Sequence, residues 1–569
     1  MKNFITTLSF SFFTTFLVFS QEVTFLKDVV PGDNCYNQKY NDDCPHSLIN
    51  VNGTLFFVLY KTSSLYKTDG TKEGTVLVKN FNNYKQPSDL IAFNGKLYFN
   101  CDDNGKHGVE LWVSDGTEAG TKMVKNINTE IDYSYGDVRD HSSVIDINHE
   151  VINLDRCVYN NLLFFTAEDS IHGRELWRTD GTEQGTILIK DLLPGTNSSV
   201  PQYFLSLNNK LYFTTNSQSQ NNKYDLWESD GTEQGTNMVS PNLLTHIYSF
   251  ANNKLLIATD FGELYAYDCN TKNTSLIYEL TAYQKKLKYS FNSSKSDTNI
   301  CYFTYSSVDT AYLMQTNGTK EGTRMIYSFT KSDLSTPSYV SIGNLELLSK
   351  KLIFSMGDEL WSMDRKTQVF DKVLGIQYYN LNYKELYSTA TALGDQRPLV
   401  FRDKIYFRSD YPPFGNPLFK ENRQLIESDG TVAGTKQITK PLTIKKQLND
   451  LTSITSTNDA IYFLRNDSIN GAEIWRYGNK VEIKTSVLTS NQLNKINIYP
   501  NPSNGKFNIT GIENKNISIF NINGITVFNV TKCTFDKLEI DLKNKIESGM
   551  YIIKISDDLN EKFVKVIIE

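Results

Sequence analysis

A recurring phrase constrains the fold more than any other feature of this sequence. It reads Glu-Leu-Trp-Val-Ser-Asp-Gly-Thr-Glu-Ala-Gly-Thr at residues 110–121 and returns at 175–186 and, with Asp225 in place of the glutamate, at 225–236. Weaker copies lie at residues 65–75, 312–323 and 425–435, and eroded copies at 263–268, 359–364 and 473–478. Repetition at a mean spacing of roughly 50 residues indicates a repeat architecture, in which each copy marks one structural unit.

Each copy lies within a repeated arrangement of four short strands. Upstream of residues 110–121, two alternating runs flank Asn94-Gly95, and Asn-Gly between such runs is a strong hairpin signal. The phrase itself supplies a third strand and a turn, and residues 122–125 supply a fourth strand. This pattern predicts an all-β fold, a β-propeller of about eight four-stranded blades, with nine as the alternative. A parallel β-helix is the main rival, but its repeats are shorter and need no paired hairpins.

The chain before the first repeat contains one further strand pattern. Residues 22–29 resemble residues 186–192, the fourth strand of a repeat, but they lack the other three strands. We predict that this N-terminal strand joins the last blade, after Glu473, and closes the ring by strand exchange.

In these repeats, over residues 47–480, the chain resembles secreted bacterial proteins built of Glu-Leu-Trp-x-x-Asp-Gly-Thr-x-x-Gly-Thr units. The resemblance implies an architecture and no activity, because such proteins share no established chemistry. We expect the turn aspartates to accept backbone N–H bonds, as Asx residues do, and the turns to be looser where Asn317 replaces the aspartate. The turn residues singled out by the repeat are Asp115, Gly116, Thr117, Gly120, Asp180, Gly181, Asp230, Gly231, Asp429 and Gly430.

Residues 489–569 follow a different pattern, so we divide the remaining chain into a propeller at 21–488 and a C-terminal module. Pro500 and Pro502 favour an extended turn before a strand at 506–510, and alternating runs continue to the end of the chain. About seven short strands predict a small, Ig-like β-sandwich.

This module resembles the type A C-terminal sorting domain of the type IX secretion system of Bacteroidetes. The resemblance implies the secretion machinery as a partner and passage across the outer membrane, followed by removal of the domain and release or surface attachment. An ordinary accessory sandwich is the alternative. The residues that carry the resemblance are Tyr499, Pro500, Asn501, Pro502, Gly505, Gly524, Gly549 and Tyr551.

Residues 1–20 have the pattern of a secretory signal peptide, with Lys2, a short apolar core and the small residue Ser20 before Gln21. The core is shorter than the roughly 20 apolar residues that a spanning helix needs. We therefore predict passage through the periplasm, no transmembrane segment after signal removal, and a secreted or outer-membrane surface-attached protein. The chain has 58 Lys and Arg against 64 Asp and Glu, a net charge of −6, which argues against a nucleic-acid partner.

Export permits disulfides, but seven cysteines in 569 residues do not form a disulfide scaffold. Their positions in the sequence allow two local disulfides, Cys35 with Cys44 and Cys269 with Cys301. The odd count leaves at least one thiol without an intramolecular partner, and Cys533 is our expectation for it.

Motifs that carry chemistry are nearly absent. The sequence has no nucleophile elbow, phosphate loop, dinucleotide fingerprint or zinc-binding helix, and we predict neither a cofactor nor catalytic residues. Asp102, Asp103 and Asn104 offer oxygen ligands for calcium, although they lack the spacing of an EF-hand and suit a solvated hairpin turn.

Two insertions between repeats, 126–156 and 365–400, are the places where we expect a binding site, because irregular loops on a rigid scaffold commonly carry binding. Their tyrosines include Tyr133, Tyr135, Tyr378 and Tyr379, which could stack on sugars. We predict a non-catalytic binding or adhesion propeller for a carbohydrate or a surface protein. A polysaccharide-degrading enzyme and a structural envelope protein are the alternatives.

Overall fold

The computed structural model forms two compact units, residues 1–481 and 482–569, which are described separately. Residues 1–20, the predicted signal peptide, lie outside the described residues. The structure describes residues 21–568 except 30–44, 60–61, 82–85, 103–106, 130–155, 218–222, 244–246, 260–261, 282–289, 307–309, 334–339, 341, 357–358, 375–397, 410–423, 440–453, 468–470, 480–496, 501–502, 513–514, 522–525, 535–536, 544–548 and 557–560.

The described part of the first unit contains nine four-stranded antiparallel sheets, which we number as blades 1 to 9. Blade 1 holds β2 (Pro45–Val51), β3 (Thr54–Leu59), β4 (Ser64–Thr68) and β5 (Val76–Asn80). Blade 2 holds β6 (Ser88–Phe93), β7 (Lys96–Asp102), β8 (Val109–Ser114) and β9 (Lys122–Met123). Blade 3 holds β10 (Arg156–Tyr159), β11 (Leu162–Asp169), β12 (Gly173–Thr179) and β13 (Ile187–Lys190). Blade 4 holds β14 (Gln202–Leu207), β15 (Lys210–Asn216), β16 (Tyr224–Ser229) and β17 (Asn237–Leu243).

The second half of the unit continues in the same strand order. Blade 5 holds β18 (Ile247–Ala251), β19 (Lys254–Ala258), β20 (Glu263–Asp268) and β21 (Thr274–Glu279). Blade 6 holds β22 (Ser290–Ser296), β23 (Cys301–Ser306), β24 (Thr310–Thr316) and β25 (Arg324–Thr330), which is followed by the short 3-10 helix η1 (Lys331–Asp333). Blade 7 holds β26 (Ile342–Leu347), β27 (Lys351–Met356), β28 (Glu359–Asp364) and β29 (Phe370–Leu374). Blade 8 holds β30 (Leu399–Phe401), β31 (Lys404–Ser409), β32 (Gln424–Ser428) and β33 (Lys436–Gln437), and blade 9 holds β34 (Ile454–Ser456), β35 (Ala460–Asp467), β36 (Gly471–Asn479) and β1 (Gln21–Phe25).

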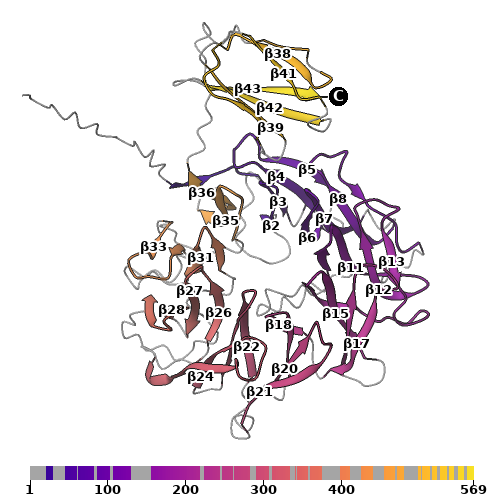
Figure 1. The fold of residues 1–569 in the computed structure, drawn as a ribbon, viewed down its shortest axis with the longest axis vertical. Coiled ribbons are helices and arrows are strands. Elements are labelled where there is room, and N and C mark those ends of the chain that lie inside the picture. Colours follow the sequence, from indigo (N-terminus) through magenta and orange to yellow (C-terminus); the bar gives the residue numbers. More distant parts are fainter. Residues whose placement is uncertain are drawn as a thin grey trace, which may run out of the picture. The chain divides into compact units, whose positions relative to one another are not determined.

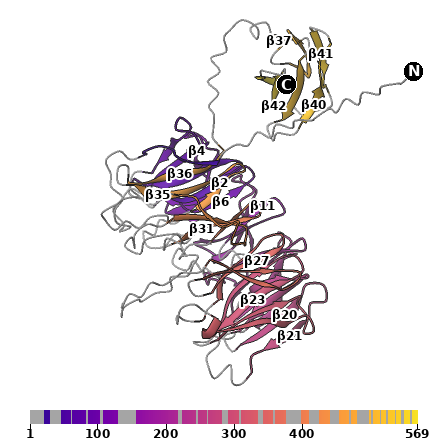
Figure 2. The ribbon, with the colours of Figure 1, turned by 90° about the vertical axis from the view of Figure 1, so that its left-hand side faces the viewer.

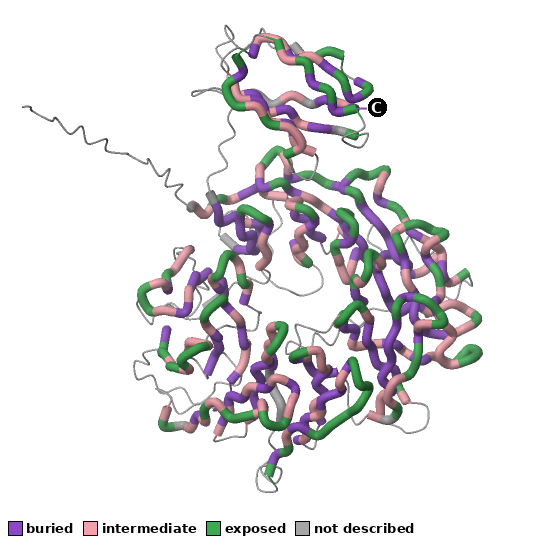
Figure 3. The backbone as a smooth tube through the Cα atoms, in the orientation of Figure 1, coloured by how far each residue is buried: buried purple, intermediate pink, exposed green. Residues whose placement is uncertain are grey.

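The sheets follow one another around a ring in chain order (Figure 1), and β35 and β36 of blade 9 lie beside blade 1 in both views (Figures 1 and 2). Among the described residues, nine clusters of buried apolar side chains each join two consecutive blades. One of them packs Tyr462 and Leu464 of blade 9 against Leu55 and Phe57 of blade 1. Figure 3 shows buried residues along the strands of the ring. The first unit is therefore a closed propeller, and its nine described sheets match the number that the sequence allowed as the alternative to eight.

The N-terminal strand closes this ring, as the sequence predicted. β1 pairs antiparallel with β36, from Gln21 opposite Asn479 to Phe25 opposite Trp475. Beyond β1, the backbone N–H of Val29 donates to Oε1 of Glu473 at 3.2 Å. The fourth strand of blade 9 is thus supplied by the other end of the unit.

Lysines from four consecutive outer strands or their exits fasten neighbouring blades together. Each donates a hydrogen bond from Nζ to the carbonyl oxygen of the last threonine in the next blade's turn. The pairs are Lys27 with Thr75 at 2.8 Å, Lys79 with Thr121 at 3.2 Å, Lys125 with Thr186 at 2.7 Å and Lys190 with Thr236 at 2.8 Å. Nζ of Lys79 and of Lys125 also lies 5.9 Å from the ring centroid of Trp112 and of Trp177, within cation–π range. The motif tryptophan and the turn of one blade therefore both contact a lysine from the preceding blade.

The second unit is a β-sandwich of seven described strands, which agrees with the number predicted. Its buried core includes Phe507, Ile519, Tyr551 and Val566 from both sheets. One sheet has the order β37 (Asn497–Tyr499), β38 (Lys506–Thr510), β41 (Lys537–Asp541), and the other the order β40 (Thr526–Val530), β39 (Asn516–Asn521), β42 (Gly549–Ser556), β43 (Glu561–Ile568). In the part of the chain that the structure describes, no helix has the length and apolar character required to cross a membrane.

The disulfide considered between Cys269 and Cys301 is wrong, because both thiols are free. Cys269 packs in the cluster between blades 4 and 5, whereas Cys301 packs in the cluster between blades 5 and 6. The sheet of blade 5 separates them, and a disulfide needs Cα atoms within about 7 Å. Cys533 is free and buried, as expected, whereas Cys35 and Cys44 lie outside the described residues.

Candidate functional site

The ring has two faces of different character. In an antiparallel blade, the turns that join strands 1 to 2 and 3 to 4 lie at one end of the strands, and the 2 to 3 and 4 to 1 connections lie at the other. We call these ends the turn face and the loop face. The turn face carries short connections, such as residues 52–53, 94–95 and 115–121, whereas the loop face carries every long one, including residues 26–44, 124–155, 375–398, 410–423 and 438–453.

Both insertions singled out from the sequence contain a 4 to 1 connection, which belongs to the loop face. Residues 124–155 connect β9 to β10. The range 365–400 was too wide, because it also includes the short turn before β29 and β29 itself, and only residues 375–398 connect β29 to β30. Their tyrosines Tyr133, Tyr135, Tyr378 and Tyr379 lie outside the described residues. Every connection between propeller strands that is longer than the turn at 115–121 belongs to this face, whereas the connections of the turn face differ by only a few residues.

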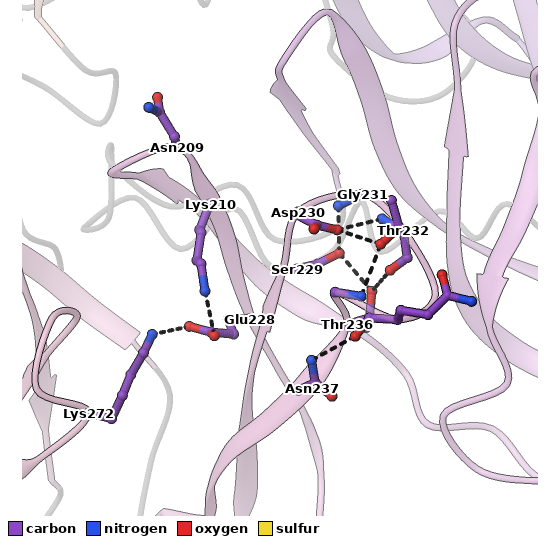
Figure 4. A network of polar contacts seen from close by, with 12 residues as sticks. Asn209, Lys210, Glu228, Ser229, Asp230, Gly231, Thr232, Thr236, Asn237 and Lys272 are labelled. Carbon is purple, nitrogen blue, oxygen red and sulfur yellow. Dashed lines mark hydrogen bonds and ion pairs between the residues drawn. The ribbon is translucent and has the colours of Figure 1, made fainter.

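The turn face is built from one turn that is copied in several blades, and Figure 4 shows the copy in blade 4. Oδ1 of Asp230 accepts hydrogen bonds from the backbone N–H of Thr232 at 2.9 Å and from its hydroxyl at 2.7 Å. The hydroxyl of Thr236 donates to the carbonyl oxygen of Thr232 at 2.6 Å. Asp115, Asp180 and Asp429 accept the same two bonds. The sequence predicted the bond from the backbone N–H but not the bond from the threonine hydroxyl.

The glycines of this turn are required by space and by backbone conformation. Gly116, Gly181, Gly231 and Gly430 all have positive φ, between 77° and 96°. The second glycine of each copy, such as Gly120 or Gly185, has no room for a Cβ atom, which would overlap the carboxylate of the turn aspartate. Asn317, expected to loosen its turn, accepts the same two bonds from Thr319, at 3.0 and 2.8 Å. The repeated turn residues therefore serve the turn, and its polar groups are engaged within it.

The motif glutamate lies at the opposite end of the blade, near the loop face. Oε1 of Glu110 accepts the backbone N–H groups of Ile127 and Asn128, both at 3.0 Å. In blade 3, Glu175 accepts the N–H of Leu192 at 3.1 Å and both the N–H and the hydroxyl of Ser199, at 3.2 and 2.6 Å. This glutamate therefore holds the segment by which the chain leaves the fourth strand, and Glu473 holds Val29 in the same way.

The carboxyl group of Glu175 is fully enclosed, and its burial raises its pKa from 4.5 to about 7 despite the hydrogen bonds that it accepts. A carboxyl group with such a pKa could exchange protons near neutral pH, but general acid or base catalysis also requires contact with a substrate. Glu175 has no exposed surface, so its arrangement is that of a structural group.

The raised pKa of Glu175 predicts a pH-dependent stability. Between pH 4.5 and 7 the folded state keeps the proton that the unfolded state has lost, so the free energy of unfolding decreases as the pH rises. We expect Glu175→Gln to remove this decrease, a difference of about 2 to 3 kcal/mol between pH 4.5 and pH 8. Urea denaturation across this range measures it. Glu183→Gln, at an exposed turn position of the same blade, is the control, and equal pH slopes for both variants would contradict the assignment.

A pocket of about 230 Å³ opens on the loop face between blades 3 and 4. Sequence reasoning missed it, although the one deviation of this copy from the phrase, Asp225 in place of glutamate, lies in its wall. The pocket is lined by Leu192, Leu193, Ser199, Thr215, Asn216, Asp225, Trp227, Met238 and Pro241.

Two buried glutamates near the turn face form a second kind of polar cluster, which the sequence analysis also missed. Glu228 lies between Lys210, at 2.6 Å, and Lys272 (Figure 4). Glu427 lies between Lys404, at 2.5 Å, and Lys436, at 3.4 Å. Burial alone would raise the pKa of each carboxyl group, but the lysines hold both pKa values below the ordinary value. Glu228 is thus a paired ion at the interface between blades 4 and 5, whereas Glu427 is paired within blade 8.

Of the three candidate calcium ligands, the structure describes only Asp102. Asp102 ends β7, and Asp103 and Asn104 lie outside the described residues. Across the residues that the structure does describe, no group of three or more His, Cys, Asp or Glu side chains is arranged to hold a metal ion.

Among the described sorting-motif residues, Gly549 and Tyr551 lie opposite the C-terminal strand β43, whereas Tyr499 pairs with β38. Tyr499 ends β37, and the backbone N–H of Ser503 donates to the carbonyl oxygen of Ile567 in β43 at 2.9 Å. Gly505 has a φ of 89°, and a Cβ atom there would lie 2.9 Å from the backbone of Lys543. Tyr551 is buried in the core and Gly549 begins β42, whereas Asn501, Pro502 and Gly524 lie outside the described residues.

Solved structures similar to the chain share little sequence with it. The extracellular domain of a protein from B. thetaiotaomicron described as a hybrid two component system is 11% identical, with coverage of 94% of this chain and 76% of that chain and a TM-score of 0.32. The tricorn protease is 12% identical, with coverage of 94% and 44% and a TM-score of 0.24. An oligogalacturonate lyase from Vibrio parahaemolyticus is 10% identical, with coverage of 58% and 90% and a TM-score of 0.32. These likenesses assign neither a ligand nor an activity to the chain.

The comparison with protein families concerns the second unit. No curated protein matches the chain. Residues 497–569 match the secretion system C-terminal sorting domain, which covers nearly all of the β-sandwich. The chain therefore carries a C-terminal sorting domain, which indicates a secreted or cell-surface protein exported by type IX secretion.

Proposed function

We propose that this protein is a non-catalytic binding or adhesion propeller, which presents its loop face to a carbohydrate or a surface protein outside the cell. The observation that carries the proposal is the unequal distribution of connection lengths. The turn face repeats one short turn whose polar groups bond one another, whereas every long connection belongs to the loop face. Long loops on a rigid scaffold are the usual means by which such a fold acquires a specific binding surface.

The route to that location is also part of the proposal. Residues 1–20 direct the chain to the periplasm and are then removed, and residues 489–569 engage the type IX machinery at the outer membrane. After export, the propeller is either released or retained at the surface. The match of residues 497–569 to a sorting domain supports this route.

The experiment that tests the binding function uses a recombinant chain of residues 21–569 and a panel of immobilised polysaccharides and glycoproteins. Retention without release of fragments is the expected result. Release of soluble fragments would identify a degrading enzyme and overturn the proposal. Absence of retention across the panel, together with stable attachment to cell envelopes, would favour a structural envelope role instead.

Retention should depend on the insertion between β9 and β10. We expect replacement of residues 130–155 by a Gly-Ser linker of about ten residues to weaken retention at least roughly tenfold, because a loop site is removed while the blades remain. The melting temperature should stay within about 2 °C of the parent, since long surface loops contribute little to stability. A matched replacement of residues 410–423, on the same face at blade 8, identifies which part of the face binds. Unchanged retention in both variants would contradict a loop-face site.

A further inference from the structure

The pocket between blades 3 and 4 combines an apolar wall with a polar edge. Leu192, Leu193, Met238 and Pro241 supply aliphatic surface, and Trp227 supplies an aromatic ring. Ser199, Thr215, Asn216 and Asp225 supply hydroxyl, amide and carboxylate groups. A concave site with a mostly apolar lining and a few placed polar groups is the usual form of a small-molecule site.

The pocket lies where blade 4 departs from its neighbour. In blade 3, Glu175 faces Ala167 across the strands and reaches the exit segment, whereas in blade 4 the facing pair is Asp225 and Thr215. Asp225 is one methylene shorter, and β17 continues as a strand to Leu243, whereas β13 ends at Lys190. The side chain that elsewhere fills this region is thus shortened, and an additional hydroxyl enters from Thr215.

The walls of the pocket are held in place before any ligand arrives. The indole N–H of Trp227 donates to the hydroxyl of Thr215 at 3.0 Å, and one face of the indole stacks on Phe213 with an interplanar angle of 11°. Ser199 is fixed by Glu175, and the backbone N–H of Asn216 donates to the carbonyl oxygen of Ser199 at 3.2 Å. A preorganised site loses little conformational freedom when it binds.

From this geometry we infer that the pocket binds one neutral sugar ring, as a subsite of the proposed loop-face binding function, on which this inference rests. A sugar ring presents an apolar C–H face, which suits Trp227, Met238 and Pro241, and a rim of hydroxyl groups. Those hydroxyls donate to the carboxylate of Asp225, which accepts up to about four hydrogen bonds, and exchange hydrogen bonds with the amide of Asn216. An anionic ligand is disfavoured by Asp225, and the volume suits one ring better than a drug-sized ligand, whose pockets span roughly 300–1,000 Å³.

The test restores the repeated residue. Asp225→Glu keeps the charge and gives blade 4 the motif of blades 2 and 3, so the fold is retained while the added methylene enters the pocket. With residues 21–569, saturation-transfer NMR against glucose, galactose, mannose and N-acetylglucosamine should detect at least one sugar with a Kd on the order of 1 mM, as expected for so few ligand atoms. We expect Asp225→Glu to weaken that binding at least roughly tenfold, and Thr215→Ala, which restores the residue of blade 3, to weaken it as well.

The control is Asp371→Glu, the same chemical change at an exposed position of β29 in blade 7, which should leave binding unchanged. Equal affinity of the parent and Asp225→Glu would overturn the subsite. The subsite would also be overturned if the same NMR experiment detected binding of the small cation methylammonium and of none of the sugars. If immobilised polysaccharide still retains the chain in that case, the subsite fails while the proposed function stands.

Discussion

Deletion of residues 21–29 should lower the melting temperature of the propeller by roughly 5 to 10 °C. The deletion removes the β1 ladder with β36, the buried side chain of Leu26, and the contacts of Val29 and Lys27 with blades 9 and 1. Burial of one leucine contributes about 1.5 to 3 kcal/mol and each hydrogen bond about 0.5 to 1.5 kcal/mol, so the total loss is about 5 to 10 kcal/mol. For a ring that unfolds as one unit of this size, about 1 kcal/mol corresponds to roughly 1 °C.

Point variants separate strand pairing from side-chain burial in this prediction. Leu26→Ala, directly after β1, should destabilise the ring by about 2 to 5 kcal/mol. Thr24→Ala, at an exposed position within β1, should change the stability by less than about 0.5 kcal/mol. Differential scanning calorimetry measures both. If the deletion left the transition unchanged, the N-terminal strand would not be closing the ring in solution.

Gly185→Ala should destabilise the protein by about 3 kcal/mol, although the change adds only one methyl group. A Cβ atom at residue 185 would overlap the carboxylate of Asp180, so the aspartate must leave the position in which it accepts two bonds from Thr182. Overpacking of this kind typically costs about 1 to 3 kcal/mol, and the lost hydrogen bonds add about 1 kcal/mol. The urea midpoint reports the change.

A double-mutant cycle shows whether this overlap is the cause. With Asp180→Ala present, the added methyl group has no carboxylate to displace, so Gly185→Ala should then cost less than about 1 kcal/mol. The coupling energy should therefore be about 2 kcal/mol in size. Additive effects of the two substitutions would mean that the glycine is needed for another reason.

Much of the first unit was predictable because its information is local and repeated. Asn94-Gly95 marks a hairpin, and the Asp-Gly-Thr turn marks the end of a third strand wherever it occurs. The number of sheets was harder to predict. The eroded copies around Glu263 and Glu359 keep the turn aspartate but have lost the turn glycines, and the copy around Glu473 has lost the aspartate. All three keep buried apolar residues, and packing between blades maintains the strands there. Local turn chemistry therefore underestimates the number of blades that packing stabilises.

Contacts between blades could not be predicted from one sequence, because their partners are separated by a whole repeat or more. Lys79, Lys125 and Lys190 recur after successive copies, and this recurrence was a usable signal for the lysine contacts. The pocket had a weaker signal, the replacement of glutamate by Asp225. The shorter side chain of Asp225 shows where this repeat departs from its neighbours. The shape of the pocket also depends on Leu192 and Pro241, which belong to no motif and therefore gave no signal in the sequence.

The pairing of Gln21 with Asn479 also determines at which face of the ring the described strands of the propeller begin and end. β1 starts and β36 ends at the turn face, so the chain enters and leaves the propeller at neighbouring points of that face. The loop-face pocket, with Asn216 and Asp225 in its wall, therefore lies at the opposite ends of the strands from the point where the described chain leaves the propeller.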